Sequence, residues 1–444
     1  MSTLVSSKIE LPAESTLIEH GEGVDTAALP KLLVVSYSYP PKEEPRAIQV
    51  SRLLRHLKAS SVLVCEGNHD SEGSATDGLG TMDSFLEQTL RVPFPNALGR
   101  DLLRRVSNRL YLPVWSRTPD HLRPWKKPVL KTIYHFMSTQ NYQPDVVVTF
   151  AFPLIDNIIG LELKRRWNLP WVAHFSDPWV DSPFRIDDPL THALNVRLER
   201  RVIQHADRLV FTSSETAALV MQKYEPALRS KVRIVPHAYE PDLFGGVPNS
   251  KNGRLVVRYL GDLYLSRTPK PLFKALEILS SSHSELLERF CFEIVGDVHK
   301  LDMEGMGLSR LPPGLVIIQQ RVNYSESLAL MTSAAGLMVI DAPVAKNTES
   351  VFLPSKLIEY VGADRPIIGL TPPGTAAYLI SRLGGWVADP GSADEVADVV
   401  QQFLTFVWER RNDFSAGWGS AAVRGEFEAN AVATKFQDVL SELI

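Results

Sequence analysis

The feature that most constrains the fold is an alternation of short apolar runs with amphipathic segments. A short apolar run ended by turn residues indicates a buried strand, and apolar residues three and four apart indicate a helix. In the first half of the chain, strands are predicted at 31–41, 61–65, 145–152, 169–175, 208–214 and 231–239. Helices are predicted between them at 46–58, 155–167 and 191–205. This α/β alternation is typical of a parallel sheet covered on both faces.

The same alternation restarts after a segment rich in proline, glycine and asparagine, 241–253. In the second half, strands are predicted at 255–262, 290–297, 314–322, 336–342, 366–371 and 385–389. Helices are predicted at 270–282, 324–334 and 355–363, and in a terminal helical region at 393–442. We therefore expect two doubly wound, Rossmann-like domains facing a cleft. The expected divisions are a flexible extension at 1–30, a first domain at 31–245, a second at 246–425 and a last helix at 426–444.

Composition narrows the functional classes. The 444 residues suffice for two or three domains, and a net charge of −4 gives no overall case for nucleic-acid binding. Cys65 and Cys291 are the only cysteines, which fits a reducing compartment and provides no framework of disulfides or zinc ligands. The first 30 residues lack a signal-peptide pattern, and no apolar run is long enough to span a bilayer. These features predict a cytoplasmic protein.

One stretch, 91–131, is strongly basic, although the net charge of the whole chain is −4. It contains ten Lys or Arg and two acidic residues, a difference of +8, and leucines are interleaved with the basic residues. A basic amphipathic segment can lie on an anionic membrane surface, so one hypothesis is peripheral contact with the inner face of the membrane. The other hypothesis is an ordinary solvated surface.

Candidate ligand-binding residues follow the first strand of the second half. Gly261 would let a ligand approach the backbone, and Arg267 and Lys270 could hold a diphosphate. The P-loop pattern, the GxGxxG pattern and any Asp-x-Asp triplet are absent from the sequence. We therefore expect the phosphates to be neutralised by protein groups alone, with no metal.

A second group of candidates opens the helix predicted at 355–363. A helix N-terminus attracts phosphate, and Ser355 and Lys356 would lie there. Glu359 follows one turn later and can accept hydrogen bonds from sugar hydroxyls. Phosphate beside a polyol is the chemistry of a nucleotide ribose. The alternative is a capping serine followed by a solvated lysine and glutamate.

In the first half, polar residues end the strand predicted at 169–175. His174 and Ser176 share one face of the strand, and Asp177 and Trp179 follow in the loop. Such residues suit the binding of a hydroxylated acceptor. The alternative is that Asp177 caps the next turn and Trp179 belongs to the core.

The chain also resembles a known family. The segments that carry the resemblance are SYSYPP, PWVAHFSDPW, ERRVIQHADRLVFTSS, VRIVPHAYEPDLF, RYLGDLYLSRTPKPLFKAL and FLPSKLIEYVGADRPIIG. They occur in the order typical of family 4 glycosyltransferases, in the branch that acts in bacterial surface-polysaccharide assembly. The resemblance spans about 31–440. It implies a GT-B fold, a last helix that crosses back to the first domain, and metal-independent transfer of a sugar from a nucleotide-sugar with retention of configuration.

The resemblance also implies roles for individual residues. Arg267 resembles the family's diphosphate-binding cation, Lys270 a second cation, and Glu359 the ribose-binding second glutamate of the E-x7-E element. The first glutamate of that element would fall at Val351, and Glu349 is two residues too early.

Two further positions depart from the family. The usual glycine-rich loop after the first strand is replaced by residues 42–45, and the usual histidine before Asp177 is Ser176, with His174 two residues away.

The sequence thus predicts a nucleotide-sugar-dependent glycosyltransferase that acts on a glycan or a lipid-linked acceptor. Arg267, Lys270 and Lys356 would stabilise the departing diphosphate, where charge grows in the transition state. Asp177 and His174 are the other candidate catalytic residues, and Asp177 and Trp179 the candidate acceptor contacts. The alternatives are a non-catalytic relative that binds a nucleotide-sugar or a partner, and a GT-B sugar-nucleotide epimerase.

Overall fold

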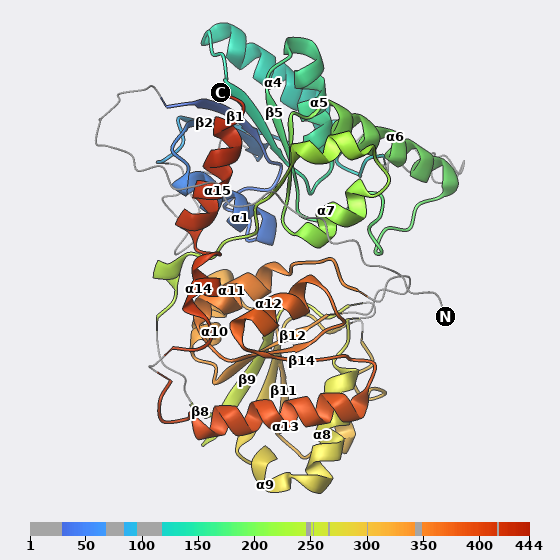
Figure 1. The fold of residues 1–444 in the computed structure, drawn as a ribbon, viewed down its shortest axis with the longest axis vertical. Helices are drawn as coiled ribbons and strands as arrows, with labels where there is room; N and C mark the ends of the chain where they lie inside the picture. Colours follow the sequence, from blue (N-terminus) through green and yellow to red (C-terminus); the bar gives the residue numbers. More distant parts are fainter. Residues whose placement is uncertain are drawn as a thin grey trace.

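The computed structural model describes residues 29–67, 84–95, 118–245, 250–251, 253–264, 267–299, 301–341, 349–414 and 417–444. These residues form two α/β domains, one above the other in Figure 1. Each domain is built on a mainly parallel sheet with helices on both faces, as the sequence predicts. The expected extension at 1–30 falls almost entirely outside the described residues.

The sheet of the first domain has the strand order β3-β2-β1-β4-β5-β6-β7, and its described pairings are all parallel. Its strands are β1 (Lys31–Val35), β2 (Ser60–Glu66), β3 (Gln88–Val92), β4 (Val146–Phe150), β5 (Trp171–Phe175), β6 (Arg208–Phe211) and β7 (Val232–Ile234). Its helices are α1 (Pro45–His56), α4 (Lys126–Thr139), α5 (Ile155–Trp167), α6 (Pro189–His205) and α7 (Ser214–Met221), with short 3-10 turns η2 (Arg123–Trp125), η3 (Pro226–Lys231) and η4 (Pro241–Leu243).

The second domain repeats this topology. Its parallel strands follow the order β11-β10-β9-β12-β13-β14, and β8 pairs antiparallel with β9. The strands are β8 (Ser250–Lys251), β9 (Arg254–Leu260), β10 (Phe290–Val295), β11 (Val316–Gln319), β12 (Gly336–Ile340), β13 (Ile367–Leu370) and β14 (Trp386–Ala388). The helices are α8 (Lys270–Ser282), α9 (Ser284–Leu287), α10 (Tyr324–Thr332), α11 (Ser355–Ala363), α12 (Thr375–Leu383), α13 (Ala393–Glu409) and α14 (Ala421–Gly425), with η5 (Leu308–Arg310).

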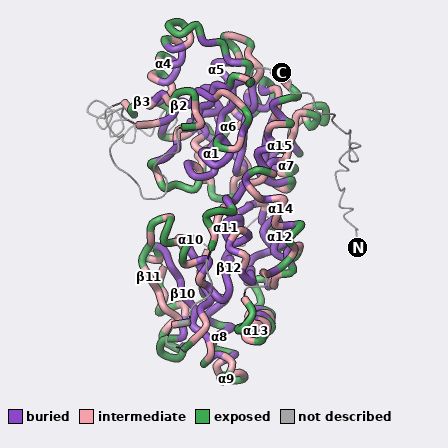
Figure 2. Tube along the Cα trace, turned by 90° about the vertical axis from the view of Figure 1, so that its left-hand side faces the viewer, coloured by how far each residue is buried: buried purple, intermediate pink, exposed green. Residues whose placement is uncertain are grey.

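Local sequence signals account for several of these boundaries. α6 begins where the side chain of Asp188 accepts hydrogen bonds from the N–H groups of Leu190 and Thr191, with Pro189 in the first turn. α10 begins with a capping box between Asn323 and Glu326. The central strands β4 and β5 are buried at every position, which matches their mostly apolar sequence. Figure 2 shows this buried interior running through both domains.

The chain returns to the first domain at its C-terminal end. α13 packs against α8 in the second domain, whereas α15 (Ala429–Ser441) lies beside α1 in the first (Figure 1). Phe436 of α15 stacks on Phe150 of β4, with ring centroids 6.3 Å apart. A single apolar cluster therefore joins α1, α15 and one face of the first sheet.

The basic stretch does not form one amphipathic helix in its described parts. Arg91 lies on β3, Trp125 is fully buried, and α4 begins at Lys126, which approaches Glu162 at 3.5 Å. Residues 96–117, with most of the leucines, lie outside the described residues, so the membrane hypothesis stays a prediction. In the part of the chain that the structure describes, no helix is long and apolar enough to cross a membrane.

Candidate functional site

The two domains contact each other near the carboxyl ends of their strands. Ser213 Oγ and Thr216 Oγ1, at the start of α7, donate hydrogen bonds to the carbonyl oxygen of Val351 at 3.2 and 2.8 Å. The rings of Phe184 and Phe352 pack beside them, with centroids 5.1 Å apart. The position where the family places its first glutamate therefore contributes a backbone contact between the domains here.

Arg267 is held at this junction by a buried carboxylate. Its Nη2 donates to Oδ1 of Asp341, just after β12, at 2.8 Å, and its Nη1 donates to the hydroxyl of Tyr264 at 3.2 Å. Burial alone would lower the pKa of Arg267, but Asp341 outweighs it and holds the pKa above its usual value. The Nε of Arg267 is buried and has no described partner. The guanidinium is thus charged and oriented, and its buried Nε donor is unused.

Lys356 lies next to Arg267 and packs over Gly261. Its Nζ donates to the hydroxyl of Tyr259 at 2.7 Å and lies 4.2 Å from the centre of that ring. Gly261 has φ +133°, and a Cβ at this position would overlap Lys356 Nζ, so only glycine fits here. Burial, reinforced by the charge of Arg267, lowers the pKa of Lys356 to about 7. Arg267 and Lys356 are therefore brought together, and among the described residues only Arg267 has a carboxylate in an ion pair with it, while Asp262 and Asp341 act on Lys356 from a greater distance.

The first turn of α11 is free of side-chain caps. Pro354 occupies the N-cap position, and Ser355 is the first helical residue, so Ser355 does not cap the helix as the alternative interpretation supposes. Uncapped N–H groups at a helix N-terminus attract anions. Lys270 opens α8 and is exposed, and no described contact ties it to this group.

Glu359 is buried, not solvated. Only 5% of its surface is exposed, and its Oε1 accepts hydrogen bonds from Arg52 Nη1 and from the hydroxyl of Tyr324, both at 3.1 Å. Arg52 lies on α1, so this ion pair connects the two domains. The second oxygen, Oε2, is buried and has no described partner. One oxygen of Glu359 is thus fixed by protein groups, and the other has an unused capacity to accept a hydrogen bond.

The first domain brings Asp177 and His174 to the same junction. Asp177 accepts a hydrogen bond from Ser176 Oγ at 3.0 Å, and burial raises the pKa of its carboxyl, partly opposed by the charges of Arg46 and Arg267. His174 is 5% exposed, and burial together with Arg46 holds its pKa well below the usual value. Asp177 therefore lies within electrostatic reach of cations from both domains.

Trp179 is a core residue. It is fully buried in the cluster under the first sheet, and its Nε1 donates to Asn195 Oδ1 on α6 at 3.2 Å. A side chain without exposed surface cannot contact an acceptor, so the structure favours the alternative interpretation and removes Trp179 from the candidate acceptor contacts.

Several residues of the junction were not found by sequence reasoning. They are Arg46, Arg52, His237, Tyr324 and Asp341. Arg46 and Arg52 lie in a segment whose apolar spacing predicts a helix, but that spacing does not show that the two arginines point toward another domain. Asp341 lies at the carboxyl end of the strand predicted at 336–342, and this position could have marked it as a candidate.

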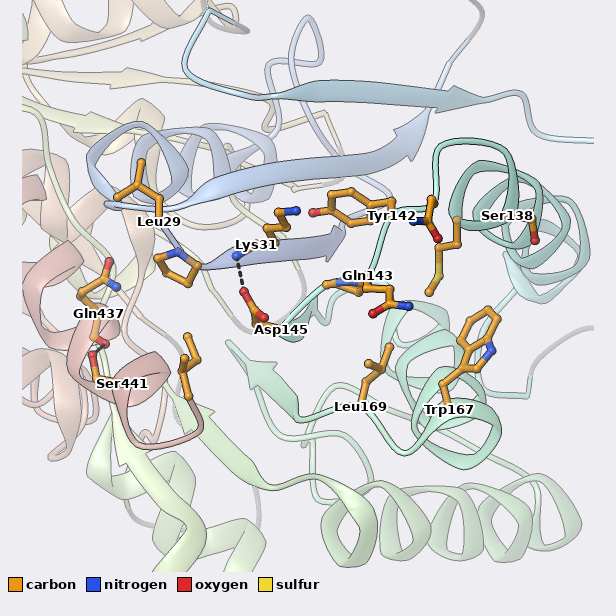
Figure 3. Close-up of a pocket in the computed structure, with 15 residues that line it drawn as sticks. Leu29, Lys31, Ser138, Tyr142, Gln143, Asp145, Trp167, Leu169, Gln437 and Ser441 are labelled. Atoms are coloured by element: carbon orange, nitrogen blue, oxygen red, sulfur yellow. Dashed lines mark hydrogen bonds between the residues drawn. The ribbon is translucent and has the colours of Figure 1, made fainter. Parts of the chain in front are cut away.

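A separate cavity of about 1140 Å³ lies at the opposite end of the first sheet. Figure 3 shows its lining, where Asp145 accepts a hydrogen bond from the N–H of Lys31 at 2.8 Å, near Trp167 and Leu169. Lys31 starts β1, Asp145 precedes β4, and Leu169 precedes β5, so the cavity lies at the amino ends of these strands. Because ligands of doubly wound sheets bind beyond the carboxyl ends, this cavity is not the candidate site.

Comparison with known proteins gives a family match for part of the chain and a fold for the whole of it. Residues 44–238 match the family described as "Glycosyl transferase 4-like domain". The matched residues lie within the first domain and span less than half of the chain. No curated protein sequence is significantly similar to the chain.

Solved structures share the whole two-domain architecture. Sucrose-phosphate synthase from Thermosynechococcus elongatus has a TM-score of 0.66 at 14% identity, over 93% of this chain and 99% of that one. The Anabaena protein HepE in complex with UDP and glucose has a TM-score of 0.61 at 14% identity, over 93% and 99%. A putative UDP-N-acetylglucosamine 2-epimerase from Listeria monocytogenes has a TM-score of 0.56 at 11% identity, over 94% and 96%. These similarities establish a GT-B fold.

The lowered pKa of Lys356 predicts that binding of UDP weakens as pH rises. The empty protein carries a protonated Lys356 only below about pH 7, whereas a bound diphosphate would raise that pKa. From pH 7 to 9 binding must then take up a proton, so the dissociation constant should rise by up to about tenfold per pH unit. Calorimetry at several pH values measures this slope. Two controls should show almost no pH dependence of the dissociation constant: uridine, which has no phosphate, binding to the unaltered protein, and UDP binding to Lys356→Gln. If both controls show the same slope as UDP with the unaltered protein, the assignment of Lys356 to the phosphates is wrong.

Proposed function

We propose that the protein is a retaining glycosyltransferase that takes a sugar from a nucleotide-sugar donor. The observation that carries this proposal is the joint placement of Arg267, Lys356 and the uncapped start of α11 beside Glu359. The first three suit a diphosphate, and the free oxygen of Glu359 suits the hydroxyls of a ribose. HepE, a structure of the same fold in complex with UDP and glucose, supports a donor of this class.

In this proposal, the protein stabilises the leaving group with its own cations. Breaking the bond between the sugar and the diphosphate leaves negative charge on the phosphate oxygens. Arg267, oriented by Asp341, and Lys356 would meet that charge at fixed positions, which cost no reorganisation during the reaction. The leaving phosphate can take the proton of the acceptor hydroxyl, and Asp177 would orient the acceptor or the transferred sugar. No metal is required for these steps.

The proposal also includes a class of acceptor and a pathway. The order of the sequence motifs supports a glycan or lipid-linked acceptor in bacterial surface-polysaccharide assembly. The basic stretch 91–131 would then hold the protein at the inner face of the membrane, where such an acceptor is embedded.

One specific observation favours a second function. The Listeria protein with the same fold is named as a putative epimerase of a sugar nucleotide, and Val351 replaces the glutamate that commonly contacts the donor sugar. An epimerase would alter the sugar of its substrate without requiring an acceptor. A protein that only binds the nucleotide-sugar would change nothing.

One experiment separates these functions. The full chain is incubated with a panel of UDP-, GDP- and ADP-sugars, with and without acceptor sugars, in the presence of a chelator. A transferase should release nucleoside diphosphate in amounts that rise with acceptor. A sugar nucleotide whose sugar is altered but still attached to its nucleotide, formed equally with and without acceptor and without net release of nucleoside diphosphate, would indicate the epimerase instead. Binding without any turnover would leave only the non-catalytic function.

A further inference from the structure

Arg46 occupies a distinctive place in the first domain. It is the second residue of α1, and Gln49, one turn later on its helix face, holds the chain that follows β7: Gln49 Oε1 accepts from the N–H of Ala238 at 3.0 Å. Arg52, further along the helix, donates to the carbonyl of Ala238. The guanidinium of Arg46 therefore lies toward His237 and the carboxyl end of the sheet.

Arg46 is a half-buried cation without a counter-ion. Within the described ranges it forms no ion pair and no side-chain hydrogen bond, although Asp177 and Asp156 are close enough to affect its pKa, which burial lowers to about 10. The two other arginines at the junction, Arg52 and Arg267, both have carboxylate partners. A guanidinium taken out of water without a partner is costly, so this one is suited to a bound anion.

Two histidines complete the surroundings of Arg46. His174 is nearly fully buried, and its Nδ1 has no described hydrogen-bond partner. Burial and the charge of Arg46 lower the pKa of His174 and bring that of His237 to about 3, so both rings are neutral. A neutral imidazole still offers one N–H donor. Arg46, His174 and His237 thus form a group of donors with a single net positive charge.

We propose that Arg46, His174 and His237 bind an anionic group, a phosphoryl or a carboxylate, that belongs to the acceptor. This inference rests on the proposed transfer function and adds a substrate class to it. The donor diphosphate has its own cations, Arg267 and Lys356, in the second domain. The Arg46 group lies wholly in the first domain, and Asp177 has cations of both groups within electrostatic reach. An acceptor anchored through its anion would present a hydroxyl to the donor next to Asp177.

Inorganic phosphate and UDP are the probes for this subsite. Phosphate is titrated into the full chain, alone and with saturating UDP, while calorimetry gives the dissociation constant and the imidazole NMR signals of His174 and His237 report its place. We expect phosphate to bind beside UDP and to shift both signals. Arg46→Gln should weaken phosphate at least tenfold, and Arg46→Lys less. Arg55→Gln, on an exposed position of the same helix, should change nothing.

Each outcome decides the inference. Phosphate displaced by UDP would assign Arg46 to the donor phosphates and overturn an acceptor subsite, as would equal binding by Arg46→Gln and the unaltered protein. A failure of UDP to bind would count against the proposed function, while the phosphate titration without UDP still tests the anion site. In turnover assays, phosphorylated or carboxylated sugars should have a lower KM than their neutral counterparts, and Arg46→Gln should remove that difference.

Discussion

Replacing Arg267 by alanine is expected to lower the turnover of the sugar donor by about 10²–10³-fold. The guanidinium is oriented by Asp341 at 2.8 Å and keeps a buried, unused Nε donor, so it is arranged before any ligand arrives. Negative charge grows on the diphosphate as the sugar leaves, and a preoriented cation stabilises that charge more than it stabilises the bound donor. The loss should therefore appear mainly in kcat, measured by release of nucleoside diphosphate.

Two controls distinguish this role from a structural one. Lys274→Ala removes an exposed cation from α8 in the same domain and should leave kcat unchanged. In Arg267→Ala, Asp341 keeps its hydrogen bond from Ser350 at 2.7 Å, so most of the fold should survive. If Arg267→Ala melts far below the unaltered protein but retains its kcat per folded molecule, the arginine only holds the domain together and the leaving-group assignment is wrong.

The elements predicted best from the sequence are those whose pattern is purely local. The helices predicted at 155–167, 270–282 and 355–363 have the same bounds in the structure, because apolar spacing defines each of them within a few turns. β3 and α4 were missed. Their residues fall in and beside the basic stretch, where charged side chains obscure the apolar alternation.

The sequence predicts several residues of the candidate site, but not the contacts between them. Arg267 and Lys356 were expected together because the carboxyl ends of parallel strands lie at one edge of a sheet. The partner of Glu359 could not be predicted, since Arg52 is 307 positions away and on the other domain. Trp179 is ambiguous for a related reason: a loop aromatic is apolar enough for a core and polar enough for a sugar. Its complete burial in the folded chain decides between them, and burial depends on contacts that are distant in sequence.

Glu359→Gln is expected to lower both the stability of the protein and its affinity for nucleosides. The Arg52–Glu359 pair is buried, with side-chain exposures of 4% and 7%, and removing one partner of such a pair costs about 3–5 kcal/mol. Arg52→Gln should cost a similar amount, and the double variant less than the sum, because neither charge is then left alone. Denaturant unfolding of the four proteins measures this coupling.

Affinity for nucleosides distinguishes the proposed role of Glu359 Oε2 in binding ribose from the role of Oε1 in the ion pair with Arg52. If Oε2 accepts ribose hydroxyls, Glu359→Gln should weaken uridine, UMP and UDP alike by about 1.5–3 kcal/mol, since the ribose is common to all three. Arg52→Gln removes the cationic partner of Oε1 but leaves the carboxylate and its hydrogen bond from Tyr324. It should therefore weaken binding of the three ligands less than Glu359→Gln does, although the two variants lose similar stability. Equal losses of affinity in the two variants would mean that the pair acts only by joining the domains, and that Glu359 does not contact the nucleotide.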